Sequence, residues 1–221
     1  VKEGRHIFDN IRKFIKYAMA ANSGEIWTIL LAPLVGLQIP LLPIHILWVN
    51  LVTDGLPGLA LSSEPAEKNI MRRPPRAPNE SLFADGLGIH MIWVGLVMGA
   101  ATLLTQALFI DHPKGHWQTM VFTVLCLSQM GHVLAVRSDR ESFFKQGFLS
   151  NKPLAGAVLL TFVLQLGPIY TPVLNAKVVQ TQPLTLEELL VALAISSVVF
   201  WGVELEKLIK RRIDAKALAA A

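Results

Sequence analysis

Two apolar stretches of the chain each carry a carboxylate beside other oxygen-bearing side chains. Asn22 and Glu25 lie three residues apart, and Asn50, Thr53 and Asp54 follow the spacing i, i+3, i+4. On a helix, each set would share one face. Hard cations such as Ca²⁺ take about six to eight oxygen ligands, whereas softer metals prefer thiolate or imidazole. The two sets therefore indicate an all-oxygen cation site between two neighbouring helices.

A glycine and a proline directly follow the second of these carboxylates, in the order Gly55, Leu56, Pro57. Pro57 has no amide hydrogen to donate to the carbonyl of Thr53, and its ring crowds that carbonyl. We expect an unwound segment that presents free carbonyl oxygens to an ion, as discontinuous transporter helices do. The alternative is a proline kink that serves only helix packing.

A weaker candidate ligand, Gln129, lies beside Ser128 in a later apolar stretch. Its amide can supply one carbonyl oxygen, but amides and hydroxyls also bridge helices in lipid, which is an equal alternative. For Glu25 the alternative is a protonated carboxyl bonded to another helix. A charge at the centre of a bilayer costs about 3 kcal/mol or more, so buried carboxylates normally mark an ion path.

The composition is that of a membrane protein. The chain has 221 residues, of which 52% are hydrophobic and only 16% are charged, against about 25% charged in soluble domains. No basic run carries interleaved aromatic residues, so we expect no nucleic-acid partner. The single cysteine, Cys126, cannot form an internal disulfide.

Long apolar runs predict an all-α membrane protein, a bundle of six transmembrane helices, because a span needs about 20 mostly apolar residues. The predicted spans cover residues 18–36, 43–63, 87–110, 117–136, 153–174 and 186–203. Lys and Arg gather before the first span, in every second connection and after the last. The positive-inside rule then predicts that both termini are cytoplasmic. The membrane would be the plasma membrane of a bacterium-like cell or an internal membrane.

The first span is preceded by a charged segment, residues 1–17, whose apolar side chains recur at helical spacing. We expect this segment to be a cytoplasmic stalk that runs directly into the first span. A separate amphipathic surface helix is the alternative. The recurring residues are Ile7, Ile11, Phe14, Ile15 and Ala18.

Residues 47–57, Leu-Trp-Val-Asn-Leu-Val-Thr-Asp-Gly-Leu-Pro, closely resemble the sixth transmembrane helix of P-type calcium pumps of the sarcoplasmic and endoplasmic reticulum kind. Residues 21–25, Ala-Asn-Ser-Gly-Glu, resemble the matching stretch of their fifth helix. Residues 1–5 are similar to the stalk that leads into it, and residues 71–76 to the loop after the sixth helix. The six spans would be the fifth to tenth of that family.

The resemblance implies that Asn22 and Glu25 bind the ion from the fifth helix. Asn50, Thr53 and Asp54 would bind it from the sixth. Gln129 stands near the position where the family's eighth helix supplies a glutamate, so one of two ion sites would be weakened. The implied function is ATP-driven export of Ca²⁺ with proton counter-transport. Pumps for Na⁺, K⁺ or Mn²⁺, and a stand-alone six-helix channel or secondary transporter, are the alternatives.

The chain contains no Asp-Lys-Thr-Gly phosphorylation motif and no Gly-rich nucleotide loop. In that family, ATP and Mg²⁺ bind to cytoplasmic domains outside the region that this chain resembles. We therefore expect partners in the bilayer and in the remaining transmembrane and cytoplasmic domains of the same pump, and no ATP hydrolysis by the chain alone. The Pro- and Arg-rich loop at 64–85 either docks on the stalk or the phosphorylation domain, or is a basic anchor.

Overall fold

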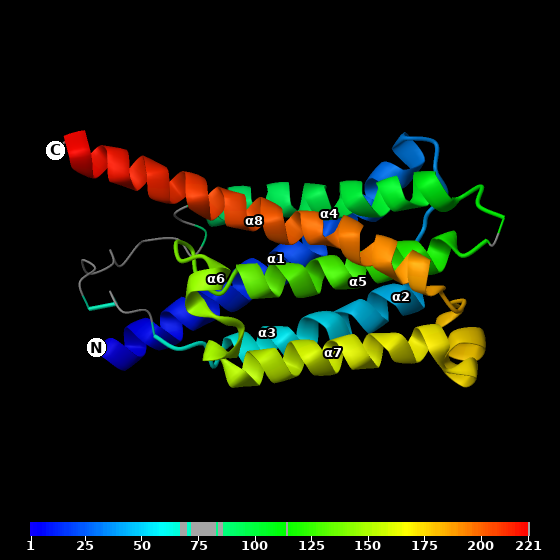
Figure 1. Ribbon diagram of the computed structural model, residues 1–221, viewed down its shortest axis with the longest axis horizontal. Coiled ribbons are helices and arrows are strands. Elements are labelled where there is room, and N and C mark those ends of the chain that lie inside the picture. The colour runs from blue at the N-terminus through cyan, green and yellow to red at the C-terminus, as the bar shows by residue number, and fades with distance from the viewer. Residues whose placement is uncertain (67–69, 72–82, 84–85, 114, 221) are drawn as a thin grey trace.

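The computed structural model describes residues 1–66, 70–71, 83, 86–113 and 115–220. All regular secondary structure in these residues is helical (Figure 1). This confirms the predicted all-α class. The elements are α1 (Lys2–Leu34), α2 (Pro43–Trp48), the π-helical η1 (Val49–Asp54), α3 (Gly55–Leu61), α4 (Leu87–Phe109), α5 (Trp117–Ala135), α6 (Phe143–Gln146), the 3-10 turn η2 (Phe148–Ser150), α7 (Lys152–Tyr170), the π-helical η3 (Leu174–Val179) and α8 (Leu186–Ala220).

The predicted stalk and the predicted first span form one uninterrupted helix. α1 has 33 residues, which corresponds to a length of about 50 Å. A bilayer core is only about 30 Å thick, so α1 is long enough to extend well beyond it. α8 likewise continues to Ala220, past the end predicted for the last span at residue 203.

Among the described residues, five helices are long and apolar enough to cross a membrane by length and composition: α2 to α3 taken together, α4, α5, α7, and α8 over Leu186–Lys216. α1 does not join this set, because the polar run from Asn22 to Glu25 lowers its mean hydropathy. With α1 as the sixth long helix, the predicted six-helix bundle is roughly consistent with the structure.

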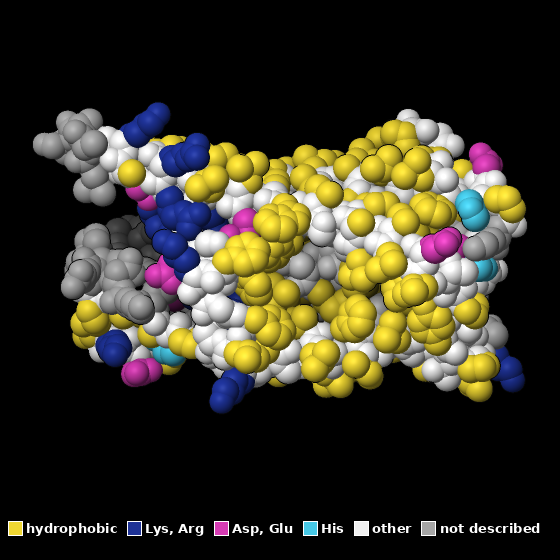
Figure 2. All heavy atoms as spheres, viewed as in Figure 1, with side chains coloured by type: hydrophobic (Ala, Val, Ile, Leu, Met, Phe, Trp, Pro, Cys, Tyr) yellow, Lys and Arg dark blue, Asp and Glu magenta, His cyan; other side chains and the backbone are white. Residues whose placement is uncertain are grey.

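α5 lies at the centre of the bundle. In its apolar segment 83% of the residues are buried, against 28–50% in the other four candidate spans. α8 and α4 lie along one side of it and α3 and α7 along the other (Figure 1). Both termini lie at the same end (Figure 1). Most of the visible Lys and Arg side chains gather at that end, whereas hydrophobic side chains cover the flank (Figure 2).

The segment that follows α3 contacts α1 through two of its backbone carbonyls, those of Ser62 and Ile70. Asn10 Nδ2 donates to the carbonyl of Ser62 (2.9 Å), and Arg5 Nη1 donates to the carbonyl of Ile70 (2.9 Å). The docking of this loop on the stalk is therefore observed at these points. All four basic residues of this loop, Lys68, Arg72, Arg73 and Arg76, lie outside the described residues.

Small residues let α1 and α4 approach closely, as is common between membrane helices. A Cβ atom added at Gly95 would overlap the side chain of Ser23, and one added at Gly99 would lie 2.9 Å from Trp27 Cβ. Gly24, on α1, would in turn meet the side chain of Met98 at 2.9 Å. The backbone of α1 is therefore held tightly against α4 beside Glu25.

Gly95→Ala is expected to destabilise the protein by about 1–3 kcal/mol, because it overpacks this contact. Gly88→Ala, on the same helix, is the matched control, since a Cβ there meets nothing within 4 Å. The second change should be neutral or stabilising, because alanine favours a helix over glycine by about 1 kcal/mol. Thermal unfolding in detergent micelles compares the two. Equal melting temperatures would contradict the tight contact.

Candidate cation site

The helix that carries Asn50, Thr53 and Asp54 widens into the π turn η1 just before Pro57. The backbone remains helical through this turn, with φ −88° and ψ −41° at Asp54. The predicted unwound segment is therefore a widened turn rather than a break. Its physical origin is the one expected: Pro57 cannot donate to the carbonyl of Thr53, and the hydroxyl of Tyr17 donates to that carbonyl instead, at 3.0 Å.

Glu25 accepts hydrogen bonds from two amides on two other elements. Asn50 Nδ2, in η1, donates to Glu25 Oε2 (3.0 Å), and Gln129 Nε2, in α5, lies 3.4 Å from Glu25 Oε1. Glu25 is only 5% exposed and Gln129 is fully buried. The structure thus brings together one predicted ligand from each of three elements.

Asp54 lies beside this group, 8% exposed. Its Oδ1 atom accepts a hydrogen bond from the hydroxyl of Tyr17 at 3.3 Å. Its Oδ2 atom is buried and has no hydrogen-bond partner among the described residues; the same holds for Thr53 Oγ1, Ser128 Oγ and Gln129 Oε1. Buried polar atoms without partners are costly, so this set of oxygens is suited to a ligand with positive charge.

Asn22 bonds to its own helix and not to any of the other predicted ligands. Its Nδ2 atom donates to the carbonyl of Ala18, 2.9 Å away on the same helix. The three-residue spacing from Glu25 was the reason for including Asn22, but three residues along a helix leave an offset between side chains. Here that offset is enough for the amide to bond to its own backbone.

The amides that bond to Glu25 can also serve a cation. A half-turn of the Asn50 or Gln129 amide exchanges its N–H₂ group for its carbonyl oxygen, so each can donate to the carboxylate or face a cation with an oxygen. Among the described residues, no three His, Cys, Asp or Glu side chains form a metal-ligand cluster. The site therefore combines two carboxylates with neutral oxygens, which is a donor set for a hard cation.

Sequence reasoning missed Tyr17, which lies at the end of the predicted stalk. It is fully buried and connects α1 to both the main-chain carbonyl of Thr53 and the carboxylate of Asp54. A signal was available, because a tyrosine at the start of an apolar run needs a hydrogen-bond partner when it is buried.

Tyr17→Phe is expected to cost about 1–3 kcal/mol of stability, because it leaves a buried carbonyl and a carboxylate oxygen without their donor. Tyr170→Phe is the control: Tyr170 also donates to a carbonyl, that of Leu184, at 3.0 Å, but its side chain is 43% exposed and water can replace it. Chemical denaturation in mixed micelles measures both variants. A Tyr17 variant as stable as the Tyr170 variant would exclude this role.

An ion pair outside the predicted spans joins α1 to the loop after α5. Lys16 Nζ lies 2.5 Å from Asp139 Oδ1. Partial removal from water would by itself raise the pKa of Asp139, but the charges of Lys16, Lys210 and Arg12 outweigh this and hold that pKa well below its usual range. A depressed carboxyl pKa stabilises the fold above about pH 4 and loses this effect as the pH falls.

Asp139→Asn is therefore expected to lower stability slightly at neutral pH and to have no effect at pH values where Asp139 is protonated. Since its side chain is 56% exposed, the expected loss is no more than about 1 kcal/mol. Melting temperatures of both proteins at a series of pH values give the comparison. Parallel curves, with the same difference at every pH, would refute the ion-pair explanation.

The sequence of the chain is similar to those of known cation-transporting ATPases. Residues 38–209 match the family described as "Cation transporting ATPase, C-terminus". The chain is similar to "Calcium-transporting ATPase" of Bacillus subtilis (strain 168), 45% identical over 178 residues, which cover 79% of this chain and 20% of that protein. It is also similar to "Calcium-transporting ATPase 1" of Bacillus cereus, 37% identical, covering 96% of this chain and 26% of that protein.

A more distant relative is "Endoplasmic reticulum calcium ATPase srcA" of Aspergillus fumigatus, 31% identical over 96% of this chain and 25% of that protein. The chain thus spans about a fifth to a quarter of the length of the curated relatives it matches. The family match covers most of the chain and includes η1, α3 and α5. The chain belongs to the family of C-terminal regions of cation-transporting ATPases.

Proposed function

We propose that the chain is the ion-binding membrane domain of an ATP-driven pump that exports Ca²⁺ from the cytoplasm. The observation that carries this proposal is the convergence of Glu25 and Asp54, both nearly buried, with the amides of Asn50 and Gln129 and the carbonyl of Thr53, which accepts from Tyr17. The names of the similar proteins favour Ca²⁺ as the transported ion.

ATP and Mg²⁺ would bind to the parts of the pump that lie outside this chain. Both chain ends would face the cytoplasm, because they lie at the same end of the bundle with most of the visible basic side chains (Figure 2) and basic residues favour that side. The pump would reside in a plasma membrane or an internal membrane.

Proton counter-transport has a physical reason at this site. After the cation leaves, Glu25 and Asp54 would remain as two carboxylates in a poorly hydrated interior, where isolated charges are very costly. Uptake of protons would neutralise them, and the next cations would displace these protons. α1 would carry the signal from the phosphorylated domain to Glu25.

The test is phosphoenzyme formation from labelled ATP by the full-length protein, with Ca²⁺, Na⁺, K⁺ or Mn²⁺ supplied in turn. Labelling that depends on Ca²⁺ would support the proposal. Labelling with another cation instead would identify a pump for that ion. A folded protein that is not labelled with any cation would favour a channel or a secondary transporter.

A further inference from the structure

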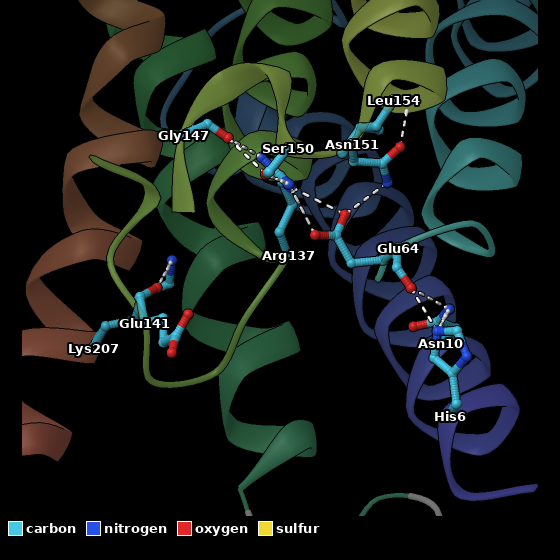
Figure 3. Close-up of polar contacts among 10 residues, drawn as sticks. All are labelled: His6, Asn10, Glu64, Arg137, Glu141, Gly147, Ser150, Asn151, Leu154 and Lys207. Carbon is cyan, nitrogen blue, oxygen red and sulfur yellow. Dashed lines mark hydrogen bonds and ion pairs between the residues drawn. The ribbon is translucent and has the colours of Figure 1, made fainter. Parts of the chain in front are cut away.

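Glu64, just after α3, uses its backbone and its side chain to bond to different parts of the molecule (Figure 3). Its main-chain carbonyl accepts hydrogen bonds from His6 Nε2 (2.7 Å) and from Asn10 Nδ2 (2.9 Å), both on α1. Glu64 itself is 3% exposed. The end of α3 is therefore bonded to α1 through the backbone of one residue.

The carboxylate of Glu64 faces away from α1. Arg137, which follows α5, donates to it from Nε at 3.0 and 3.1 Å and from Nη2 at 2.9 Å. Asn151, before α7, donates to the same carboxylate from Nδ2 at 2.7 Å. Arg137 and Asn151 are 1% and 2% exposed, so this is a buried, fully hydrogen-bonded ion pair.

The two partners of this carboxylate extend the connection further. Arg137 Nη1 donates to the carbonyl of Gly147 at 3.0 Å, and Asn151 Oδ1 caps α7 by accepting from the amide of Leu154 at 3.0 Å. A displacement of α1 that moves the backbone of Glu64 would therefore also move the end of α5 and the start of α7.

We propose that Glu64 and Arg137 are positioning residues that hold the ligand-bearing elements of the cation site in register and transmit displacements of α1 to them. The inference rests on the proposed function for its link to cation binding. α1 carries Glu25, the helix that ends before Glu64 carries Asp54, and α5 carries Gln129. All three elements meet at this one junction, at the end of the bundle where the termini lie.

The mechanical connection is tested without any activity, by hydrogen exchange in the full-length protein. The double variant His6→Ala/Asn10→Ala removes both donors on α1 to the Glu64 carbonyl and is expected to raise exchange at the Leu154 amide by about five-fold or more. Thr28→Ala is the matched control on the same helix, because among the described residues Thr28 Oγ1 bonds to the backbone of its own helix, at Gly24. Exchange at Leu154 that does not respond to His6→Ala/Asn10→Ala would overturn the inference.

The effect on the site is tested with the double variant Glu64→Gln/Arg137→Gln, which leaves no unpaired charge. We expect the cation concentration for half-maximal phosphorylation to rise by about five-fold or more while the maximal level is retained. The control is Glu204→Gln/Lys207→Gln, which removes the buried ion pair between Glu204 and Lys207 (2.6 Å) at the same end of the bundle. Lys207 also donates to the carbonyl of Glu141 (Figure 3).

A merely structural role of Glu64 and Arg137 would lower the stability of both double variants and leave both half-maximal concentrations unchanged, which would overturn the inference. If the wild-type protein is not phosphorylated with any cation, the proposed function fails. The exchange experiment then decides alone whether α1 is coupled to α7.

Discussion

Asp54→Asn in the full-length pump is expected to raise the Ca²⁺ concentration needed for phosphorylation by about 100-fold. The substitution keeps the shape of the side chain and leaves an oxygen that can accept from Tyr17, so the fold should be retained. What it removes is one of the two negative charges of the site. A hydrogen bond or contact to a charged group contributes up to about 3 kcal/mol, and each 1.4 kcal/mol is a factor of ten in affinity.

Asn22→Ala provides the comparison for this result. The Asn22 amide bonds to the carbonyl of Ala18 on its own helix, so its removal should change the half-maximal Ca²⁺ concentration far less than Asp54→Asn does. Labelling of the full-length protein at graded Ca²⁺ concentrations measures both. If the Asp54 variant were labelled at the wild-type Ca²⁺ concentration, Asp54 would not be a ligand.

Arg137→Ala is expected to lower the free energy of unfolding by about 3–5 kcal/mol, because it leaves the carboxylate of Glu64 buried without its counter-charge. The loss should exceed that of most single substitutions, which cost about 0.5–3 kcal/mol. The variant also removes the donors to the carbonyl of Gly147 and the hydroxyl of Ser150.

The control for this prediction is Arg140→Ala, three residues further along the chain. Arg140 also pairs with a carboxylate, that of Asp214, but the two side chains are 60% and 40% exposed. Exposed pairs contribute only about 0–1 kcal/mol. The free energy of unfolding, measured for both variants in detergent, should therefore be much lower for Arg137→Ala than for Arg140→Ala. Similar free energies of unfolding would mean that the burial of Arg137 has no energetic consequence.

The sequence predicts the helical class and the long helices well, because membrane helices need long apolar runs and these are visible without a structure. It also places Glu25 near Asn50, since two helices joined by a short turn pack as neighbours. The π turn is harder to predict: Pro57 indicates that the carbonyl of Thr53 lacks its donor, but not whether the helix breaks or widens.

The role of Tyr17 and the burial of Arg137 depend on contacts between distant parts of the chain. Arg137 belongs to a group of basic residues that the sequence assigns only to membrane orientation, and its 1% exposure follows from a partner 73 positions away. The hydrogen bond of Asn22 to its own helix is equally invisible, because spacing alone fixes the face of a residue and not its bonding partner.

Because α1 packs tightly against α4 at one place, α1 can pivot about that contact as a rigid helix. The helix is held against α4 where Gly24 meets Met98 and Gly95 meets Ser23, and the chain from there back to Lys2 rises by about 33 Å. Glu25 directly follows Gly24 and therefore lies next to this contact. A movement of the far end of this rigid helix would therefore displace Glu25 by only a small fraction of that movement but with a larger force. Under the proposed function, this would help Glu25 to release a bound cation.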